Sequence, residues 1–169
     1  MAAISMMPPA LDNLYTDHHR TVFSAAYRIT GSVADAEDVL HTVFVRLLKK
    51  PGVIENPEGY LRRAAVNAAL DVVRGRRGNV DGVELDRMPS ALRDGADAVG
   101  DSELRGQLRA ALATLPERAA EVFVLRHFEG HRNPEIARML GITQIGVAVT
   151  LHRARKKLQE ELRKAGVRS

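Results

Sequence analysis

The 169-residue sequence contains no cysteine and no tryptophan, and only 4% of its residues are aromatic. The absence of cysteine excludes disulfide bonds, thiolate zinc sites and cysteine nucleophiles. No run of about eighteen apolar residues occurs, and the first ten residues carry no basic segment, so the sequence predicts neither a membrane span nor an export signal. We therefore expect an intracellular protein of the cytoplasm.

Charge is distributed unevenly along the chain. Hydrophobic residues make up 45% of the sequence, which is enough to build packed cores and argues against a disordered protein. The net charge of +4 combines ten basic and eight acidic side chains in residues 1–77, two and seven in residues 78–103, and thirteen and six in residues 104–169. Two basic ends around an acidic centre predict two modules that face a polyanion, joined by a segment that does not bind it directly.

Apolar residues recur at helical spacing through most of the chain, and no segment shows the alternation of a β-strand. Gly31 predicts the end of one helix, Ser32 the capped start of the next, and Asn56-Pro57 the start of a third. Residues 78–100 lack any sustained period and are typical of a linker. The sequence predicts an all-α protein with helices over residues 11–30, 32–50, 56–77, 104–130 with a break at Pro116, 133–141 and 143–164.

The most specific local signal is the segment PEIARMLGIT at residues 134–143. A short helix ends at Gly141 and Thr143 caps a second one, which predicts a helix-turn-helix whose second helix enters the major groove of DNA. An ordinary helical hairpin with a solvated basic face is the alternative. The tail of the second helix carries four cations that could reach phosphates: Arg153, Arg155, Lys156 and Lys157.

The predicted helix of residues 56–77 combines cations with an aromatic ring and polar groups. Tyr60 stands near its start, and Asn67 and Asp71 share a face one turn apart. An aromatic ring beside amide and guanidinium groups can stack on unpaired bases and bond to them, which favours single-stranded DNA. In the alternative, Tyr60 lies in the core and the arginines are a solvated face. Those arginines are Arg62, Arg63, Arg74, Arg76 and Arg77.

Signals for catalysis or metal binding are weak. His127 and His131 are four residues apart, but the glutamate between them is misplaced for a metalloprotease and Gly130 should interrupt the required helix. The acidic residues at positions 35–38 are explained by the dipole at a helix start. Without a phosphate loop or a serine nucleophile motif, the sequence predicts no enzyme, no cofactor and no metal.

Three sequence segments occur in an order and spacing that together are highly specific for one protein family. They are DAEDVLHTVFVRLL at 35–48, NPEGYLRRAAVNAALDVVRGRR at 56–77, and LATLPERAAEVFVLRHFEGHRNPEIARMLGIT at 112–143 followed by LHRARKKL at 151–158. With these segments, the chain resembles the sigma-70 family of RNA polymerase sigma factors, and within it the small two-domain factors of the extracytoplasmic function group. The resemblance implies sigma region 2 in residues 1–77, a linker over 78–103 and sigma region 4 in residues 104–169.

The resemblance also implies a function and partners. The chain would bind core RNA polymerase and direct promoter recognition, DNA opening and transcription initiation, with its first module on the clamp helices and its second on the flap. Promoter DNA would be the second partner, and an anti-sigma factor is a further candidate. Matching positions on the second predicted helix would contact the polymerase: Asp35, Asp38, Val43, Phe44 and Leu47.

Promoter contacts are implied on two predicted helices. Residues matching those that melt and read the minus-ten element are Asn56, Tyr60, Asn67, Asp71 and Arg74, with Arg76 and Arg77 on backbone phosphates. For the minus-thirty-five element, the cap and the outward face of the last helix offer Thr143, Gln144, Ala148, Thr150, His152 and Arg153.

The recognition helix departs from the family pattern. Family members commonly have Gly-Thr-Val-Lys-Ser-Arg, whereas residues 145–150 are Ile-Gly-Val-Ala-Val-Thr, so both expected cations are missing. This favours an alternative in which the chain is a sigma-derived interaction protein with degenerate DNA reading by its second module. An apolar patch of Ile145, Ala148 and Val149 on this helix would then bind a protein partner.

Overall fold

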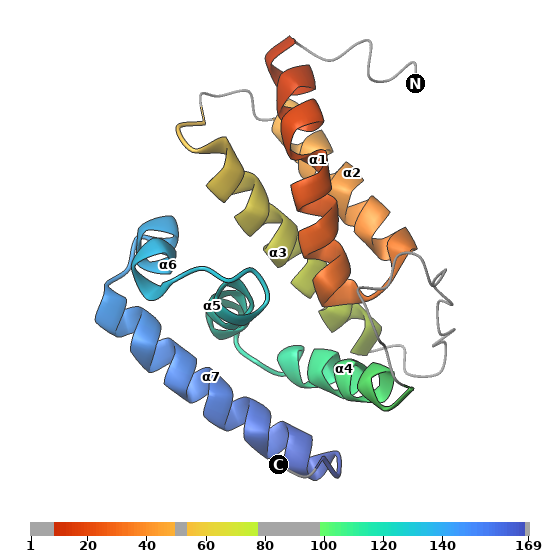
Figure 1. Cartoon of the computed structure of the whole chain (residues 1–169), viewed down its shortest axis with the longest axis vertical. Coiled ribbons are helices and arrows are strands. Elements are labelled where there is room, and N and C mark those ends of the chain that lie inside the picture. Colours follow the sequence, from red (N-terminus) through yellow and green to blue (C-terminus); the bar gives the residue numbers. More distant parts are fainter. Residues whose placement is uncertain (1–8, 50–53, 78–98, 168–169) are drawn as a thin grey trace.

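The computed structural model describes residues 9–49, 54–77 and 99–167, which form seven helices (Figure 1). These ranges contain no β-strand, and the prediction of an all-α fold is confirmed. None of the described helices combines the length and apolar character that a membrane crossing needs. The helices are α1 (Pro9–Thr30), α2 (Val33–Lys49), α3 (Pro57–Arg77), α4 (Val99–Leu112), α5 (Glu117–His127), α6 (Asn133–Leu140) and α7 (Gln144–Lys164).

The helix boundaries follow the predicted caps. Ser32, Asn56 and Thr143 each accept a hydrogen bond from the backbone N–H three residues further on, at 3.2, 3.1 and 2.9 Å. Each bond satisfies a donor that has no partner inside its helix. Gly141 ends α6 in the left-handed conformation with φ 65°, as its position predicted.

One boundary differs from the prediction. α4 begins at Val99, five residues before Leu104, where the apolar period resumes. The first residues of α4 precede the apolar period, so that period cannot mark where the helix begins. The rest of the predicted linker, residues 78–98, lies outside the described residues.

The helices form two units, α1–α3 and α4–α7, which meet along α3 (Figure 1). α1 packs against α2 and α3, while α7 packs against α4, α5 and α6. α3 also contacts α4, α5 and α6, so its outer surface faces the second unit. Each unit has fully buried aliphatic side chains, each worth about 1.5–3 kcal/mol of burial. They include Ile29, Leu61 and Leu70 in the first unit and Leu112, Leu125 and Ile136 in the second.

The end of α1 is one place where the units meet. The Arg109 side chain of α4 donates from Nε to the Ile29 carbonyl at 3.1 Å, and so satisfies a carbonyl at the end of that helix. Gly31 has φ 68°, and a Cβ atom there would lie 2.2 Å from the Arg109 guanidinium. Glycine therefore serves both the helix stop and the close approach of α4.

Candidate nucleic-acid interface

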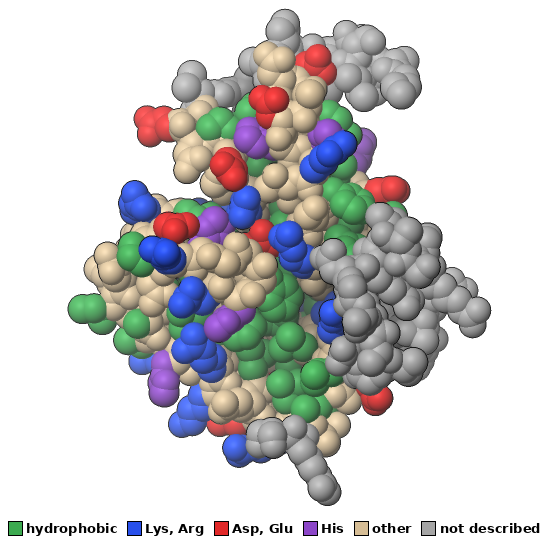
Figure 2. Space-filling model, viewed as in Figure 1, with side chains coloured by type: hydrophobic (Ala, Val, Ile, Leu, Met, Phe, Trp, Pro, Cys, Tyr) green, Lys and Arg blue, Asp and Glu red, His purple; other side chains and the backbone are tan. Residues whose placement is uncertain are grey.

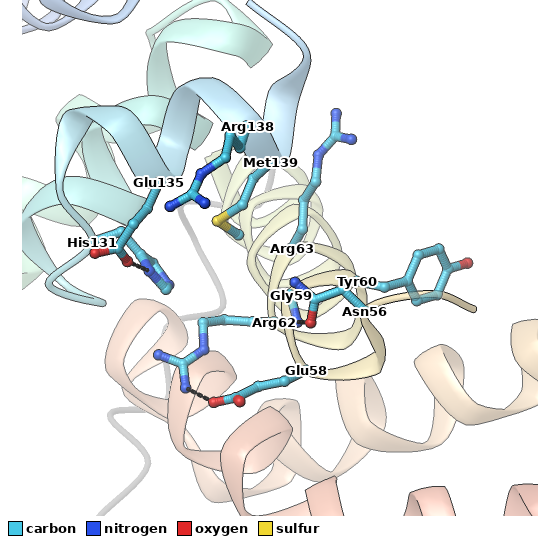
Figure 3. Close-up of a pocket in the computed structure, with 10 residues that line it drawn as sticks. All are labelled: Asn56, Glu58, Gly59, Tyr60, Arg62, Arg63, His131, Glu135, Arg138 and Met139. Atoms are coloured by element: carbon cyan, nitrogen blue, oxygen red, sulfur yellow. Dashed lines mark hydrogen bonds and ion pairs between the residues drawn. The ribbon is translucent and has the colours of Figure 1, made fainter. Parts of the chain in front are cut away.

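Tyr60 lies on the outer surface of α3. Its backbone N–H bonds to the Asn56 carbonyl at 3.0 Å, while its side chain is 47% exposed and points away from α6 (Figure 3). Leu61 and Ala65 turn into the core. The alternative that places Tyr60 in the core is therefore wrong, and the ring is free to stack on a base.

Asn67 and Asp71 have different partners although they stand one turn apart. Asn67 Nδ2 donates to Glu121 Oε1 of α5 at 3.1 Å, and its own Oδ1 is buried without a hydrogen-bond partner. Asp71 is exposed and lies 3.4 Å from Arg74 Nη1. The side chains of residues 76–77, which include the predicted phosphate contacts Arg76 and Arg77, lie outside the described part of the chain.

Two glutamates of the second unit bind the cations around α3. Arg63 Nε donates to Glu121 Oε1 at 2.5 Å, and Glu121 is only 3% exposed. Glu129, just after α5, lies 3.1 Å from Arg28 Nη1 and 3.6 Å from Arg62 Nη1. Sequence reasoning missed both glutamates. Glu121 could have been noticed, because it is a charged residue among the apolar residues Ala120, Val122, Val124 and Leu125.

A cleft of about 570 Å³ lies between α3 and α6 (Figure 3). Its walls carry three guanidinium groups, those of Arg62, Arg63 and Arg138. On the α6 side, His131 Nδ1 lies 3.0 Å from Glu135 Oε2, and this hydrogen bond is the main cause that lowers the pKa of the Glu135 carboxyl. The cleft thus holds charges of both signs, with Glu58 beside the arginines of α3 and Glu135 beside Arg138 on α6.

The structure places most of the predicted polymerase contacts in the interior. Val43, Phe44 and Leu47 are 2%, 4% and 8% exposed and belong to the core between α1, α2 and α3. Asp35 is half-buried and Asp38 is exposed. Of this set, Asp38 is therefore the side chain most accessible to a partner.

The outward face of α7 changes character along its length. Ile145 and Val149, in its first half, are 78% and 42% exposed, whereas the second half carries Arg and Lys side chains (Figure 2). Thr150 is half-buried, and its hydroxyl donates to the Gly146 carbonyl at 2.7 Å. The remaining predicted residues on this helix are exposed: Gln144, Ala148, His152 and Arg153.

His127 and His131, the two histidines four residues apart, do not converge. His127 Nε2 accepts a hydrogen bond from Arg155 Nε at 3.3 Å, and burial, followed by the charges of Arg155 and Arg126, lowers the pKa of His127. His131 is paired with Glu135 instead. Among the described residues, no group of three potential ligands is placed to hold a metal ion.

Comparison with known proteins matches each of the two units to a family model. The family model of sigma-70 region 2 matches residues 14–78, and that of sigma-70 region 4 matches residues 105–158. The chain is 33% identical to RNA polymerase sigma-E factor of Streptomyces coelicolor, over 82% of this chain and 77% of that protein. It is 30% identical to the ECF sigma factor SigL of Mycobacterium tuberculosis, over 91% and 89%. The chain belongs to the sigma-70 family, in its extracytoplasmic function (ECF) group.

Other relatives agree with this family assignment. The ECF sigma factor SigE of Mycolicibacterium smegmatis is 34% identical over 92% of this chain, which spans 63% of the length of that protein. Two solved structures share the fold. They are CnrH in complex with the cytosolic domain of CnrY (TM-score 0.53, 24% identity, 96% of this chain and 94% of that chain) and Bartonella quintana RpoE in complex with the anti-sigma factor NepR (0.52, 19%, 88% and 94%).

Proposed function

We propose that this ECF sigma factor binds core RNA polymerase and directs promoter recognition, DNA opening and transcription initiation. The observation that carries the proposal is that both sigma regions occur in one chain and each has an exposed helix suited to DNA. The polymerase supplies the chemistry, so the chain itself catalyses no reaction and needs no cofactor. It acts in the cytoplasm, beside the polymerase and the chromosome.

Region 2, proposed to span residues 1–77, docks on the polymerase clamp helices through α2. The exposed carboxylate of Asp38 makes a polar contact there, with half-buried Asp35 beside it. Val43, Phe44 and Leu47 are buried, and in this proposal they hold α2 in place for the contact.

The same region reads the minus-ten element on α3. Tyr60 stacks on an unpaired base, because its ring is exposed beside a cationic surface. Asn67 and Asp71 supply hydrogen bonds, and Asn56 shapes the start of the helix through its bond to Gly59. Arg74 belongs to the same reading set, while Arg76 and Arg77 contact backbone phosphates.

Region 4, proposed for residues 104–169, rests on the polymerase flap and contacts the minus-thirty-five element through α7. Thr143 caps the helix, and Gln144, Ala148, Thr150 and His152 lie toward the bases. Arg153 anchors a phosphate. The proposed linker spans residues 78–103, and its last five residues already belong to α4.

An anti-sigma factor is a further candidate partner. The two solved structures with this fold are complexes with an anti-sigma factor, NepR, and with the cytosolic domain of CnrY. Exposed Ile145 and Val149 offer apolar area that a protein could cover. This is also the observation that favours the second candidate function, a protein-interaction regulator with degenerate DNA reading.

Run-off transcription tests the proposal directly. Purified chain and cognate core polymerase are incubated with a library of genomic fragments, and transcript start sites are compared with those of core enzyme alone. The proposal expects a small set of new start sites with a shared upstream sequence. Stable binding to core enzyme without any new start site would favour the interaction regulator.

We expect region 4 to contribute modest, salt-sensitive affinity with weak base discrimination. The exposed face near the start of α7 lacks an arginine that could bind guanine through two hydrogen bonds, and its apolar groups can contact only thymine methyls. Scrambling the minus-thirty-five sequence at fixed salt should therefore reduce transcription much less than a hundredfold. A hundredfold loss, equivalent to about 2.7 kcal/mol, would show strong specific reading.

The thymine methyl contacts have their own control. Uracil in place of thymine keeps every hydrogen-bonding group of the base and removes only the methyl. Deoxyuridine substitution in the minus-thirty-five element should therefore weaken binding of the wild-type chain and have less effect on Ala148→Ser, which lacks the exposed methyl on the base-facing side of α7.

A further inference from the structure

A pocket of about 460 Å³ lies between α1 and the turn that follows α5 (Figure 1). One wall is a line of side chains on α1, those of Arg20, Ser24 and Arg28, which are four residues apart and therefore share one face of the helix. The turn contributes residues 127–130 to the lining. Ligand pockets usually measure about 300–1,000 Å³, so this one is large enough for a small molecule.

Positive charge exceeds negative charge in the lining of this pocket. The guanidinium groups of Arg20, Arg28 and Arg62 line it, against one carboxylate, that of Glu129. Arg62 is also paired with Glu58, which lies outside the pocket, at 3.1 Å. Arg20 is exposed and makes no ion pair with any residue that the structure describes. The excess charge is therefore carried mainly by the α1 wall.

Two further cations lie near the other wall. His127 Nε2 accepts a hydrogen bond from Arg155 Nε at 3.3 Å. Burial lowers the pKa of His127, and the charges of Arg155 and Arg126 lower it further, so the imidazole is neutral at pH 7. Neither of these arginines has a carboxylate partner in the described ranges of the chain. The electrostatic field at this end of α5 thus favours an anion.

Glu129 shows which chemistry the guanidinium groups of the pocket accept. Its two carboxylate oxygens lie 3.1 and 3.2 Å from Arg28 Nη1. A phosphate group offers the same kind of charged oxygen acceptor. Within the described residues, Arg28 forms these bonds through Nη1 alone, which leaves Nη2 and Nε for a second oxyanion.

Uncharged groups complete the pocket. The hydroxyl groups of Thr21 and Ser24 line it beside the α1 arginines, and each can donate a hydrogen bond to a phosphate oxygen. Phe128, which is half-buried, adds an aromatic ring that can pack against the base of a nucleotide. The lining therefore combines cations, hydroxyl donors and one apolar surface, as a site for a phosphorylated small molecule requires.

We propose that this pocket binds a small ligand with two or more linked phosphate groups, held by Arg20 and Arg28 and by the hydroxyls of Thr21 and Ser24. These groups line a pocket rather than a protruding helix face, which favours a small anion over a DNA backbone. The ligand contacts both regions and therefore stabilises the folded chain when it binds. The site does not include Tyr60, so it is independent of the proposed reading of the minus-ten element.

Calorimetric titration of the full chain with pyrophosphate, tripolyphosphate and ATP, all at one ionic strength, tests the site. Saturable binding is expected, and Arg20→Gln should weaken it about fivefold, because one exposed charge that faces the anion is removed. Arg118→Gln is the matched control, since Arg118 is an exposed arginine on α5 outside the pocket. Ser24→Asp is a second variant if circular dichroism shows that Arg20→Gln does not fold. Its new carboxylate would occupy the same arginines and prevent binding.

Amide chemical shifts of the isotope-labelled chain locate the bound anion. Pyrophosphate should shift the amides of Thr21, Ser24 and Gly130, which line the pocket, and leave that of Gly141 at the end of α6 unmoved. Tighter binding of ATP than of tripolyphosphate would support a nucleotide ligand with its base on Phe128. Equal or weaker binding of ATP would support a ligand recognised by its phosphate chain alone.

The outcomes that overturn the proposal are distinct. Absence of saturable binding by the wild type would exclude the site. Equal weakening in Arg20→Gln and Arg118→Gln would also do so, because only the net charge of the chain would then attract the anion. Shifts at Thr21, Ser24 and Gly130 with duplex DNA but not with pyrophosphate would assign the α1 arginines to a nucleic-acid backbone instead.

Discussion

A chain carrying Tyr60→Ala should fold and bind core polymerase but fail to open promoters. Tyr60 is exposed and forms no part of the core, so its removal leaves the packing of α3 unchanged. The loss of stacking on one base costs about 1–3 kcal/mol, which corresponds to roughly five- to 150-fold in the open complex. Permanganate reactivity of unpaired thymines near the start site measures this loss.

Two variants control this result. Tyr60→Phe keeps the ring and should open the promoter nearly as well as the wild type, which separates stacking from any bond of the hydroxyl. Arg77→Ala should weaken binding to all sequences alike and reduce the salt slope by about one unit, because it removes a proposed phosphate contact. Normal permanganate reactivity in Tyr60→Ala would remove Tyr60 from the proposed site.

Asp38→Arg should weaken binding to core polymerase at least about tenfold, or about 1.4 kcal/mol, while the helix content stays normal. Asp38 is exposed on α2, so its replacement leaves the fold intact. An arginine at this position would place a positive charge against the polymerase group that the carboxylate contacts, which is unfavourable. Titration of labelled chain with core enzyme gives the affinity. Phe44 and Leu47 are poor choices for this test, because both are buried and their loss would destabilise region 2.

Glu37→Arg is the matched control for this charge reversal. Glu37 is also exposed, but it points about a hundred degrees away around α2. If only Asp38 contacts the polymerase, Glu37→Arg should bind core enzyme like the wild type. Equal affinity of the wild type and Asp38→Arg would show that α2 docks through another face.

Local chemistry explains why the helices could be predicted. Ser32, Asn56 and Thr143 are capping residues that bond to an N–H three positions away, so a short window of sequence contains both partners. The apolar period similarly identifies the buried face of each helix, as Val39, Val43 and Leu47 illustrate on α2. α4 began earlier than predicted because the apolar period that marked it resumes only at Leu104, after the helix has started.

The candidate site was predictable only in part. The aromatic and cationic character of residues 56–77 marked α3 for DNA, and the motif order indicated the family. An apolar period, however, does not say whether a side chain faces the core or a partner. Phe44 was assigned to the polymerase contact by the family resemblance, and only the structure shows that its side chain, at 4% exposure, belongs to the core.

The sequence by itself determined the helices, their caps, the two basic regions and the sigma family, because each depends on neighbouring residues or on motif order. Only the tertiary structure decided which groups meet across the two regions. Arg63 and Glu121 are 58 positions apart, and Arg28 and Glu129 are 101 apart. No local pattern pairs such residues, since their contact depends on how α5 packs against α3.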